Sequence, residues 1–69
     1  DVILANINKN ILKKHLPKYF DSLCENGLLY LSGFFSTDVS ELKTLANQVG
    51  FKFISTTVKD EWAILILQK

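Results

Sequence analysis

The 69-residue chain is predicted to be an α/β domain with elements in the order strand, helix, strand, helix, strand, strand. Short runs of purely apolar side chains alternate with segments whose apolar residues recur every three or four positions, the patterns of buried strands and of amphipathic helices. The last two predicted strands follow each other with no helix between them. Two right-handed crossovers followed by a hairpin are therefore expected.

The first strand is predicted over residues 2–5. All side chains from Val2 to Ala5 are apolar and half of them are β-branched. This pattern fits a strand covered on both faces, as in a parallel sheet. The strand ends at Asn6.

A helix follows, because apolar residues continue at a spacing of four from Ile11 to Cys24. Asn8 or Asn10 could cap its first turn. Pro17 lacks a backbone donor and clashes with the preceding turn, so a kink is expected, or two helices with Pro17 at the first position of the second.

The next segment ends one helix, adds a strand and begins another helix. Asn26-Gly27 supplies a left-handed residue to end the first helix. Residues 28–31 form a second apolar run, which Ser32-Gly33 is expected to stop. Asp38 and Glu41 resemble a capping box at the start of a helix that Gly50 closes.

The final hairpin shapes the predicted sheet. Residues 51–58 are rich in β-formers with one more polar face, which indicates an edge strand. After a turn at residues 59–61, the run from Trp62 to Leu67 is too apolar for an edge. We therefore expect the last strand to insert antiparallel between the second and third strands.

Composition excludes several classes of function. Eight lysines against seven acidic residues give a net charge of +1 with no block of like charge, which argues against a nucleic-acid surface. The single cysteine, Cys24, can form neither an intrachain disulfide nor a zinc site, and it indicates a reducing, cytoplasmic setting. The longest apolar run, residues 62–67, is far shorter than the roughly 20 residues of a membrane span.

The first residues suggest that the chain is a piece of a larger domain. It opens on Asp1 rather than methionine and passes directly into an apolar strand. A sequence of this size buries only about 60% of its unfolded surface, so an independent fold would be marginal. We therefore interpret residues 1–69 as a partial domain.

Four blocks of sequence together resemble the C-terminal half of the class I S-adenosylmethionine-dependent methyltransferases, which have a Rossmann-like sheet. Within that superfamily the chain is most similar to the family that methylates large-subunit ribosomal protein number eleven. The resemblance covers essentially the whole chain. The blocks are the opening DVILANI, the LxxxLP step from Leu12 to Pro17, NGLLYLSGF from Asn26 to Phe34, and DEWAILIL from Asp60 to Leu67.

The resemblance implies a methyl transfer from S-adenosylmethionine to amino groups of a ribosomal protein. It also implies that the family's glycine-rich cofactor loop, the acidic residue after the second strand and the substrate-recruiting domain have no counterpart here. The chain would begin at the fourth strand of the complete sheet and is expected to be inactive alone.

Asn6 is the candidate catalytic residue. Ligands of open parallel sheets bind beyond the carboxyl ends of strands where the strand order reverses. By resemblance, Asn6 and Ile7 lie beside the methionine moiety of the cofactor and the methyl group. An amide oxygen can accept a hydrogen bond from an amine without stabilising its ammonium form. The alternative is an asparagine that serves the turn or caps the next helix.

Two further groups are expected at the same edge of the sheet, where they could contact substrate. Ser32, Gly33 and Phe34 follow the second strand, although they could equally be a turn with an apolar plug. The turn with Asp60, Glu61 and Trp62 returns to the edge roughly 10 Å from Asn6, given strands about 4.8 Å apart. Its alternative is a solvated acidic turn with Trp62 in the core.

The remaining polar candidates are interpreted as structural. His15 has no acid or cysteine at a spacing that forms a catalytic pair or a metal site, and it is expected to be a partly buried helix residue. Cys24 is interpreted as a small core residue. The four lysines of residues 9–18 are expected to form a solvated helix face.

Two hypotheses follow. In the first, the chain is the C-terminal part of a protein methyltransferase. In isolation it is then expected to self-associate through the unpaired edge and apolar faces of the strand that would adjoin the missing half of the sheet. In the second, it is a small stand-alone α/β interaction module that pairs with a partner through the exposed edge of Val2 to Ala5. The first predicts the spatial strand order first, second, fourth, third.

Overall fold

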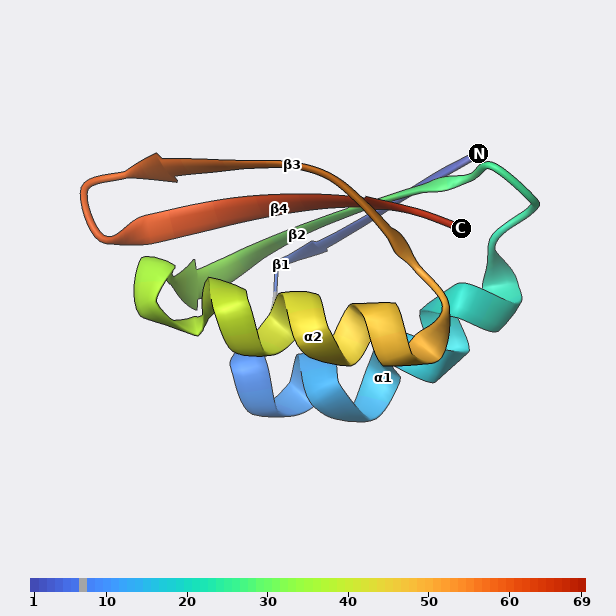
Figure 1. Ribbon diagram of the computed structural model, residues 1–69, viewed down its shortest axis with the longest axis horizontal. Coiled ribbons are helices and arrows are strands. Elements are labelled where there is room, and N and C mark those ends of the chain that lie inside the picture. The colour runs from blue at the N-terminus through green and yellow to red at the C-terminus, as the bar shows by residue number, and fades with distance from the viewer. Residues whose placement is uncertain (7) are drawn as a thin grey trace.

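The computed structural model describes residues 1–6 and 8–69 as one four-stranded sheet with two α-helices (Figure 1). The strand order is β1-β2-β4-β3, with β1 parallel to β2 and with β4 antiparallel to both β2 and β3. The predicted insertion of the last strand is therefore confirmed. The elements are β1 Val2–Asn6, α1 Lys9–Ser22, β2 Leu28–Phe35, the 3-10 turn η1 Ser36–Asp38, α2 Val39–Val49, β3 Lys52–Lys59 and β4 Trp62–Gln68.

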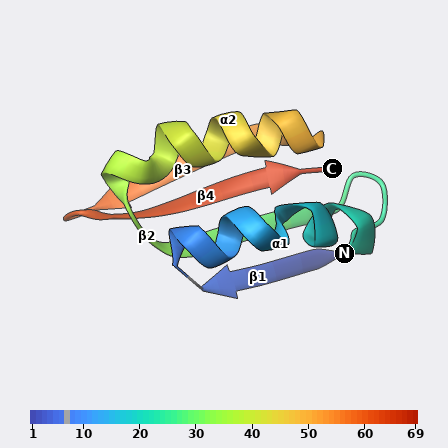
Figure 2. The ribbon, with the colours of Figure 1, turned by 90° about the horizontal axis from the view of Figure 1, so that it is seen from below.

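The molecule has two layers, because both helices pack on the same face of the sheet (Figure 2). Apolar side chains from alternate strand positions meet the helices there, and most are almost fully buried. The core comprises Ala5, Leu12, Leu16, Leu23, Leu29, Leu31, Phe34, Leu42, Ala46, Phe51, Ala63, Leu65 and Leu67.

The opposite face of the sheet, here called the open face, is not covered by a helix in the described part of the chain. Leu4 is 76% exposed and Val2 is 54% exposed on it. The expectation that β1 is covered on both faces is therefore wrong for these residues. Both α1 and α2 pack on one face of the sheet. Neither helix therefore covers the other face of the apolar strand β1.

Helix α1 begins where the sequence predicted, because the Asn8 side chain accepts a hydrogen bond of 3.0 Å from the backbone N–H of Ile11. Pro17 lies inside a single helix, so the two-helix alternative is wrong. Leu12 and Leu16 are buried on one side of this helix, whereas Pro17 is exposed. Packing of these leucines stabilises the helix despite the hydrogen bond that Pro17 cannot donate.

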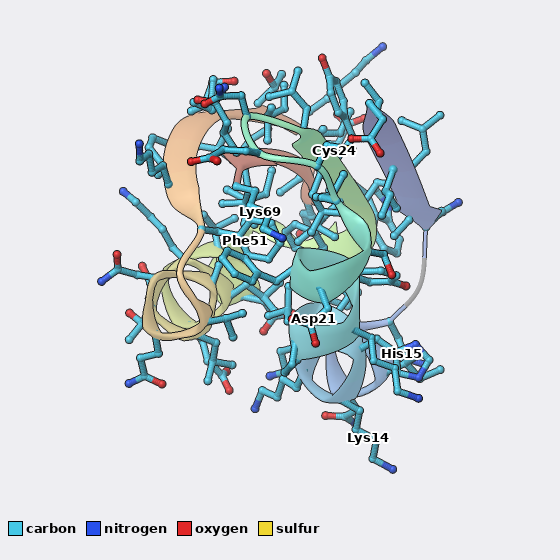
Figure 3. The ribbon with its side chains drawn as sticks, turned by 90° about the vertical axis from the view of Figure 1, so that its right-hand side faces the viewer. Lys14, His15, Asp21, Cys24, Phe51 and Lys69 are labelled. Carbon is cyan, nitrogen blue, oxygen red and sulfur yellow. The ribbon has the colours of Figure 1, made fainter. Side chains whose placement is uncertain are left out.

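The end of α1 differs from the expectation at Asn26-Gly27. The helix stops at Ser22, and Asn26 adopts a left-handed backbone angle (φ 68°) in the turn that follows. Cys24 therefore leaves the helical stripe and is exposed, so its assignment to the core was wrong. The Lys69 side chain, labelled in Figure 3, donates a hydrogen bond of 2.9 Å to the carbonyl of Leu23.

The capping box at Asp38 and Glu41 is also wrong. Asp38 ends the η1 turn in a helical conformation, and its side chain makes no cap hydrogen bond. Its carboxylate instead accepts a bond of 3.2 Å from Lys9 on α1. Gly50 closes α2 with φ 123°, as expected of a residue without a side chain.

The final hairpin has an edge strand and a central strand, as predicted. β3 starts at Lys52, one residue later than expected, because the backbone N–H of Phe51 donates a hydrogen bond of 2.9 Å to the carbonyl of Ala46 at the end of α2. Pairing skips from Phe53 to Ser55, which leaves Ile54 as an extra residue and reverses the alternation beyond it. Phe53 and Ser55 therefore lie on opposite faces, which the uninterrupted sequence pattern did not predict.

Candidate functional site

Two polar side chains meet at the last pair of the β1–β2 ladder, although β2 itself continues past Ser32 to Phe35 and is not stopped by Ser32-Gly33 as the sequence predicted. Asn6 and Ser32 are paired positions of the parallel ladder, so they lie side by side on the open face. The cap on α1 is provided by Asn8, and this leaves the exposed Asn6 side chain free of the capping role considered for it. The carboxyl edge of these parallel strands is where ligands of such sheets bind.

A hollow of about 440 Å³, here called the Asn6 groove, extends from these residues across the open face toward the hairpin. Its size is within the usual range for small-molecule sites. All four strands contribute residues to it, so no single sequence block defines it. Its lining residues are Asn6, Ser32, Gly33, Thr57, Lys59, Trp62, Ala63 and Ile64.

A second hollow of about 270 Å³ adjoins the first through Asn6, Ser32 and Ile64. Leu4 and Tyr30 make its remaining exposed wall, so it is largely apolar. Asn6 therefore lies between two hollows, one toward the β1 edge and one toward the hairpin. An amide in this position can contact ligands on either side.

The structure brings some of the predicted residues together and separates others. Ser32, Gly33 and Trp62 line the groove with Asn6, whereas Phe34 is 2% exposed and belongs to the core on the opposite face. Glu61 lines a neighbouring hollow of about 290 Å³ with Phe35, Ser36 and Thr37. Ile7 lies outside the described residues.

Trp62 is 54% exposed, so its interpretation as a core residue is wrong. Its ring stacks on Phe35, with 4.7 Å between the ring centroids and 24° between the ring planes. Sequence reasoning missed Phe35, Thr57 and Lys59. The signal that could have found Phe35 is the double phenylalanine, because only one of two adjacent strand residues can face the core.

A family model, described as ribosomal protein L11 methyltransferase (PrmA), matches residues 1–69. The chain belongs to the ribosomal protein L11 methyltransferase family. The resemblance noted in the sequence blocks is thereby confirmed over the entire chain.

Individual members of the family agree with this assignment. A ribosomal protein L11 methyltransferase of Phocaeicola vulgatus is 36% identical over 63 residues, which are 91% of this chain and 22% of that protein. One of Chlorobaculum parvum is 35% identical over 68 residues, 99% of this chain and 23% of that protein. The chain thus spans about a fifth of the length of the curated relatives it matches.

A solved structure has the same fold. The ribosomal protein L11 methylase of Lactobacillus delbrueckii subsp. bulgaricus superposes with a TM-score of 0.90 at 24% sequence identity, covering 97% of this chain and 35% of that one. The predicted α/β architecture, with the last strand inserted antiparallel between the second and third strands, is therefore confirmed.

Four charged residues form a network away from the groove, between α1 and the start of α2. Lys9 is bonded to Asp38 at 3.2 Å and to Glu41 at 3.3 Å, and Lys13 also pairs with Glu41. The hydrogen bonds from Lys13 and Lys9 lower the pKa of Glu41. The bonds to Asp38 and Glu41 raise the pKa of Lys9. These pairs hold the helices together on the covered side of the sheet.

The other titratable side chains considered in the sequence form no further site among the described residues. His15 is half-buried beside Tyr19, with ring centroids 6.1 Å apart, as expected of a structural histidine. Lys14 points away from the molecule (Figure 3). Residues 1–6 and 8–69 contain no group of three or more histidines, cysteines or carboxylates arranged to hold a metal. Neither α1 nor α2 has the length and apolar character needed to cross a bilayer.

Proposed function

We propose that residues 1–69 are the C-terminal part of the catalytic domain of a protein methyltransferase, which transfers methyl groups from S-adenosylmethionine to amino groups of a ribosomal protein. Family membership over the whole chain supports the reaction, and the relatives' names point to ribosomal protein L11 as substrate. The observation that carries the site is the exposed Asn6 amide, which lies between two hollows at the carboxyl edge of the parallel strands.

Asn6 is proposed to orient the acceptor amine. S-adenosylmethionine, when bound, would supply an electrophilic methyl group: the lone pair of a neutral amine would form the new N–C bond in line as the C–S bond breaks, the thioether would leave, and the methylated amine would then lose a proton. The amine nitrogen must be held about 3 Å from the methyl carbon and must keep its lone pair. The amide oxygen of Asn6 can accept one N–H of that amine, and an uncharged acceptor does not favour the ammonium form.

The lining of the groove fits an amine on an aliphatic stem. Trp62 and Ile64 provide apolar surface and Ser32 provides a hydroxyl, while Gly33 leaves space for a chain to pass. Lys59 is the one charged side chain among the described lining residues. None of these described side chains carries a negative charge that would promote protonation of a bound amine.

The chain supplies only one wall of the proposed cofactor site. Asn6 is proposed to contact the cofactor together with Ile7, which lies outside the described residues. The glycine-rich loop that cradles the rest of the cofactor is proposed to belong to another part of the polypeptide. We therefore expect the 69-residue chain to be inactive alone and the complete protein to act in the cytoplasm on a protein substrate, without direct contact to nucleic acid.

The test uses the complete polypeptide, with methyl incorporation into ribosomal protein L11 measured by mass spectrometry. Asn6→Ala should lower kcat by about 10²-fold, the loss typical of one positioned polar group. Asn6→Asp should move the remaining activity to higher pH, since a carboxylate stabilises the ammonium form. Asn10→Ala, two residues into α1 and exposed, is the matched control. Full activity of Asn6→Ala would rule out the proposed role.

An interaction module remains a second candidate function, favoured by one observation. β1 lies at the edge of the sheet, and its exposed Leu4 offers both an unpaired backbone and an apolar side chain to a partner strand. The upstream reading frame separates the candidates. A strand followed by a glycine-rich loop supports the enzyme, whereas a start codon directly before Asp1 supports the module.

A further inference from the structure

An irregularity in β2 decides which of two adjacent phenylalanines reaches the open face. Leu31 pairs with Leu65 and Phe34 pairs with Ala63, so β2 advances by three residues while β4 advances by two. Gly33, with φ 90°, accommodates this bulge. In a regular strand Phe34 would face outward and Phe35 inward, because a shift of one residue exchanges the faces.

The bulge therefore sends Phe35 to the open face, where it pairs directly with Trp62. The two rings stack 4.7 Å apart, although 48% of Phe35 and 54% of Trp62 remain exposed. A backbone hydrogen bond of 2.8 Å from Ser36 to the carbonyl of Glu61 ties the two strand ends together beside the stack. The stack thus joins the β2 end firmly to the start of β4.

The two rings border different hollows. Trp62 lines the Asn6 groove, whereas Phe35 lines the hollow on the other side with Glu61. Phe35 is therefore behind Trp62 as seen from Asn6, and it does not line the groove itself. A half-exposed tryptophan without such a support can exchange between side-chain rotamers on a nanosecond timescale.

We propose that Phe35 is a positioning residue, which holds the Trp62 ring as the wall of the acceptor groove, and that the Gly33 bulge exists to place it there. This inference rests on the proposed function, because it assigns the groove to the aliphatic stem of the acceptor amine. The wall contacts that stem before and during transfer alike, so its loss weakens substrate binding more than it slows the chemical step.

The first test observes the ring directly. Trp62 is the single tryptophan of residues 1–69, so its emission and anisotropy report on this site alone in the complete polypeptide once every tryptophan outside this segment is replaced by phenylalanine. Phe35→Leu should shift the emission to longer wavelength and lower the anisotropy, and Phe35→Tyr should restore both. Phe53→Leu is the matched control, because Phe53 is 41% exposed and lies under Lys43 rather than beside Trp62. Unchanged emission in Phe35→Leu would overturn the proposal.

The second test measures kinetics in the complete polypeptide, with a lysine peptide of the substrate as acceptor. Phe35→Leu should raise KM about two- to tenfold, the range expected for loss of an aromatic pair, with kcat changed less than twofold. Phe35→Tyr should rescue KM. Wild-type activity with an unaltered KM in Phe35→Leu would refute the positioning role and leave the proposed function intact, whereas an inactive wild type would refute the function itself.

Discussion

The ion pairs of Lys9 and Lys13 with Asp38 and Glu41 are expected to make the stability of the fold depend on pH. The hydrogen bonds from Lys13 and Lys9 lower the pKa of Glu41 in the folded state. A carboxyl group with a lowered folded pKa stabilises the fold above its unfolded pKa, roughly 4.3, and this contribution is lost as pH falls through the folded pKa. Lys9 has a raised pKa, so its contribution is lost only at strongly alkaline pH.

Replacement of Glu41 by glutamine should remove this contribution. We expect Glu41→Gln to be slightly less stable than the wild type at neutral pH and to show a smaller loss of stability as pH falls below the unfolded pKa of roughly 4.3. Urea unfolding at several pH values measures both effects. Glu25→Gln, an exposed carboxylate in the turn before β2, is the control. The difference should shrink in high salt, and a difference that persists there would contradict an ion-pair origin.

Residue-level prediction succeeded where a local bond decides the outcome and failed where tertiary contacts do. Asn8 caps α1 and Gly50 closes α2 through interactions within a few residues, which a sequence pattern can reveal. Asp38 has the type and spacing of a cap, yet Lys9 on the other helix takes its carboxylate. The sequence does not indicate this competition, because the partners are 29 positions apart.

At the scale of elements, the order of helices and strands and the central place of β4 were predictable, because apolar periodicity and run length set them. The strand irregularities were not. An extra residue at Gly33 or Ile54 moves each later side chain of that strand to the opposite face of the sheet. The residue types in β2 and β3 are compatible with either arrangement. Because the groove depends on which side chains face it, Asn6, Ser32 and Trp62 were predicted while Phe35 was missed.

The bulge in β2 can be tested through its glycine. Gly33→Ala should destabilise the fold by about 1 to 2 kcal/mol, because a residue with a side chain is strained at φ 90°. The Trp62 emission should shift as well, since the Phe35 ring depends on the bulge. Ser32→Ala, the adjacent residue of the same strand, should alter neither property by a comparable amount. A fully stable Gly33→Ala with native emission would show that the bulge does not depend on glycine.

At the scale of the whole molecule, the open face distinguishes a part of a larger sheet from a complete module. Leu4, Val2, Ile64, Trp62 and Phe35 leave much of this face apolar, while the net charge of +1 provides little repulsion between copies. A stable interface buries about 800 Å² per partner. The accessible surface of the chain is 4378 Å², so one side of its four-stranded sheet can supply that area.

We therefore expect the isolated 69-residue chain to self-associate through the open face and the β1 edge, as measured by sedimentation velocity over a range of concentrations. Leu4→Lys should shift the distribution toward monomer, because a buried lysine in the contact is costly. Ile11→Lys in α1, which packs on the other face of the sheet, replaces a side chain that is 40% exposed and should leave the distribution unchanged. The opposite result would be a wild-type chain that stays monomeric at its solubility limit and whose β1 amides are protected from exchange. It would show that the open face and the β1 edge are stable without a partner, and it would favour the stand-alone module.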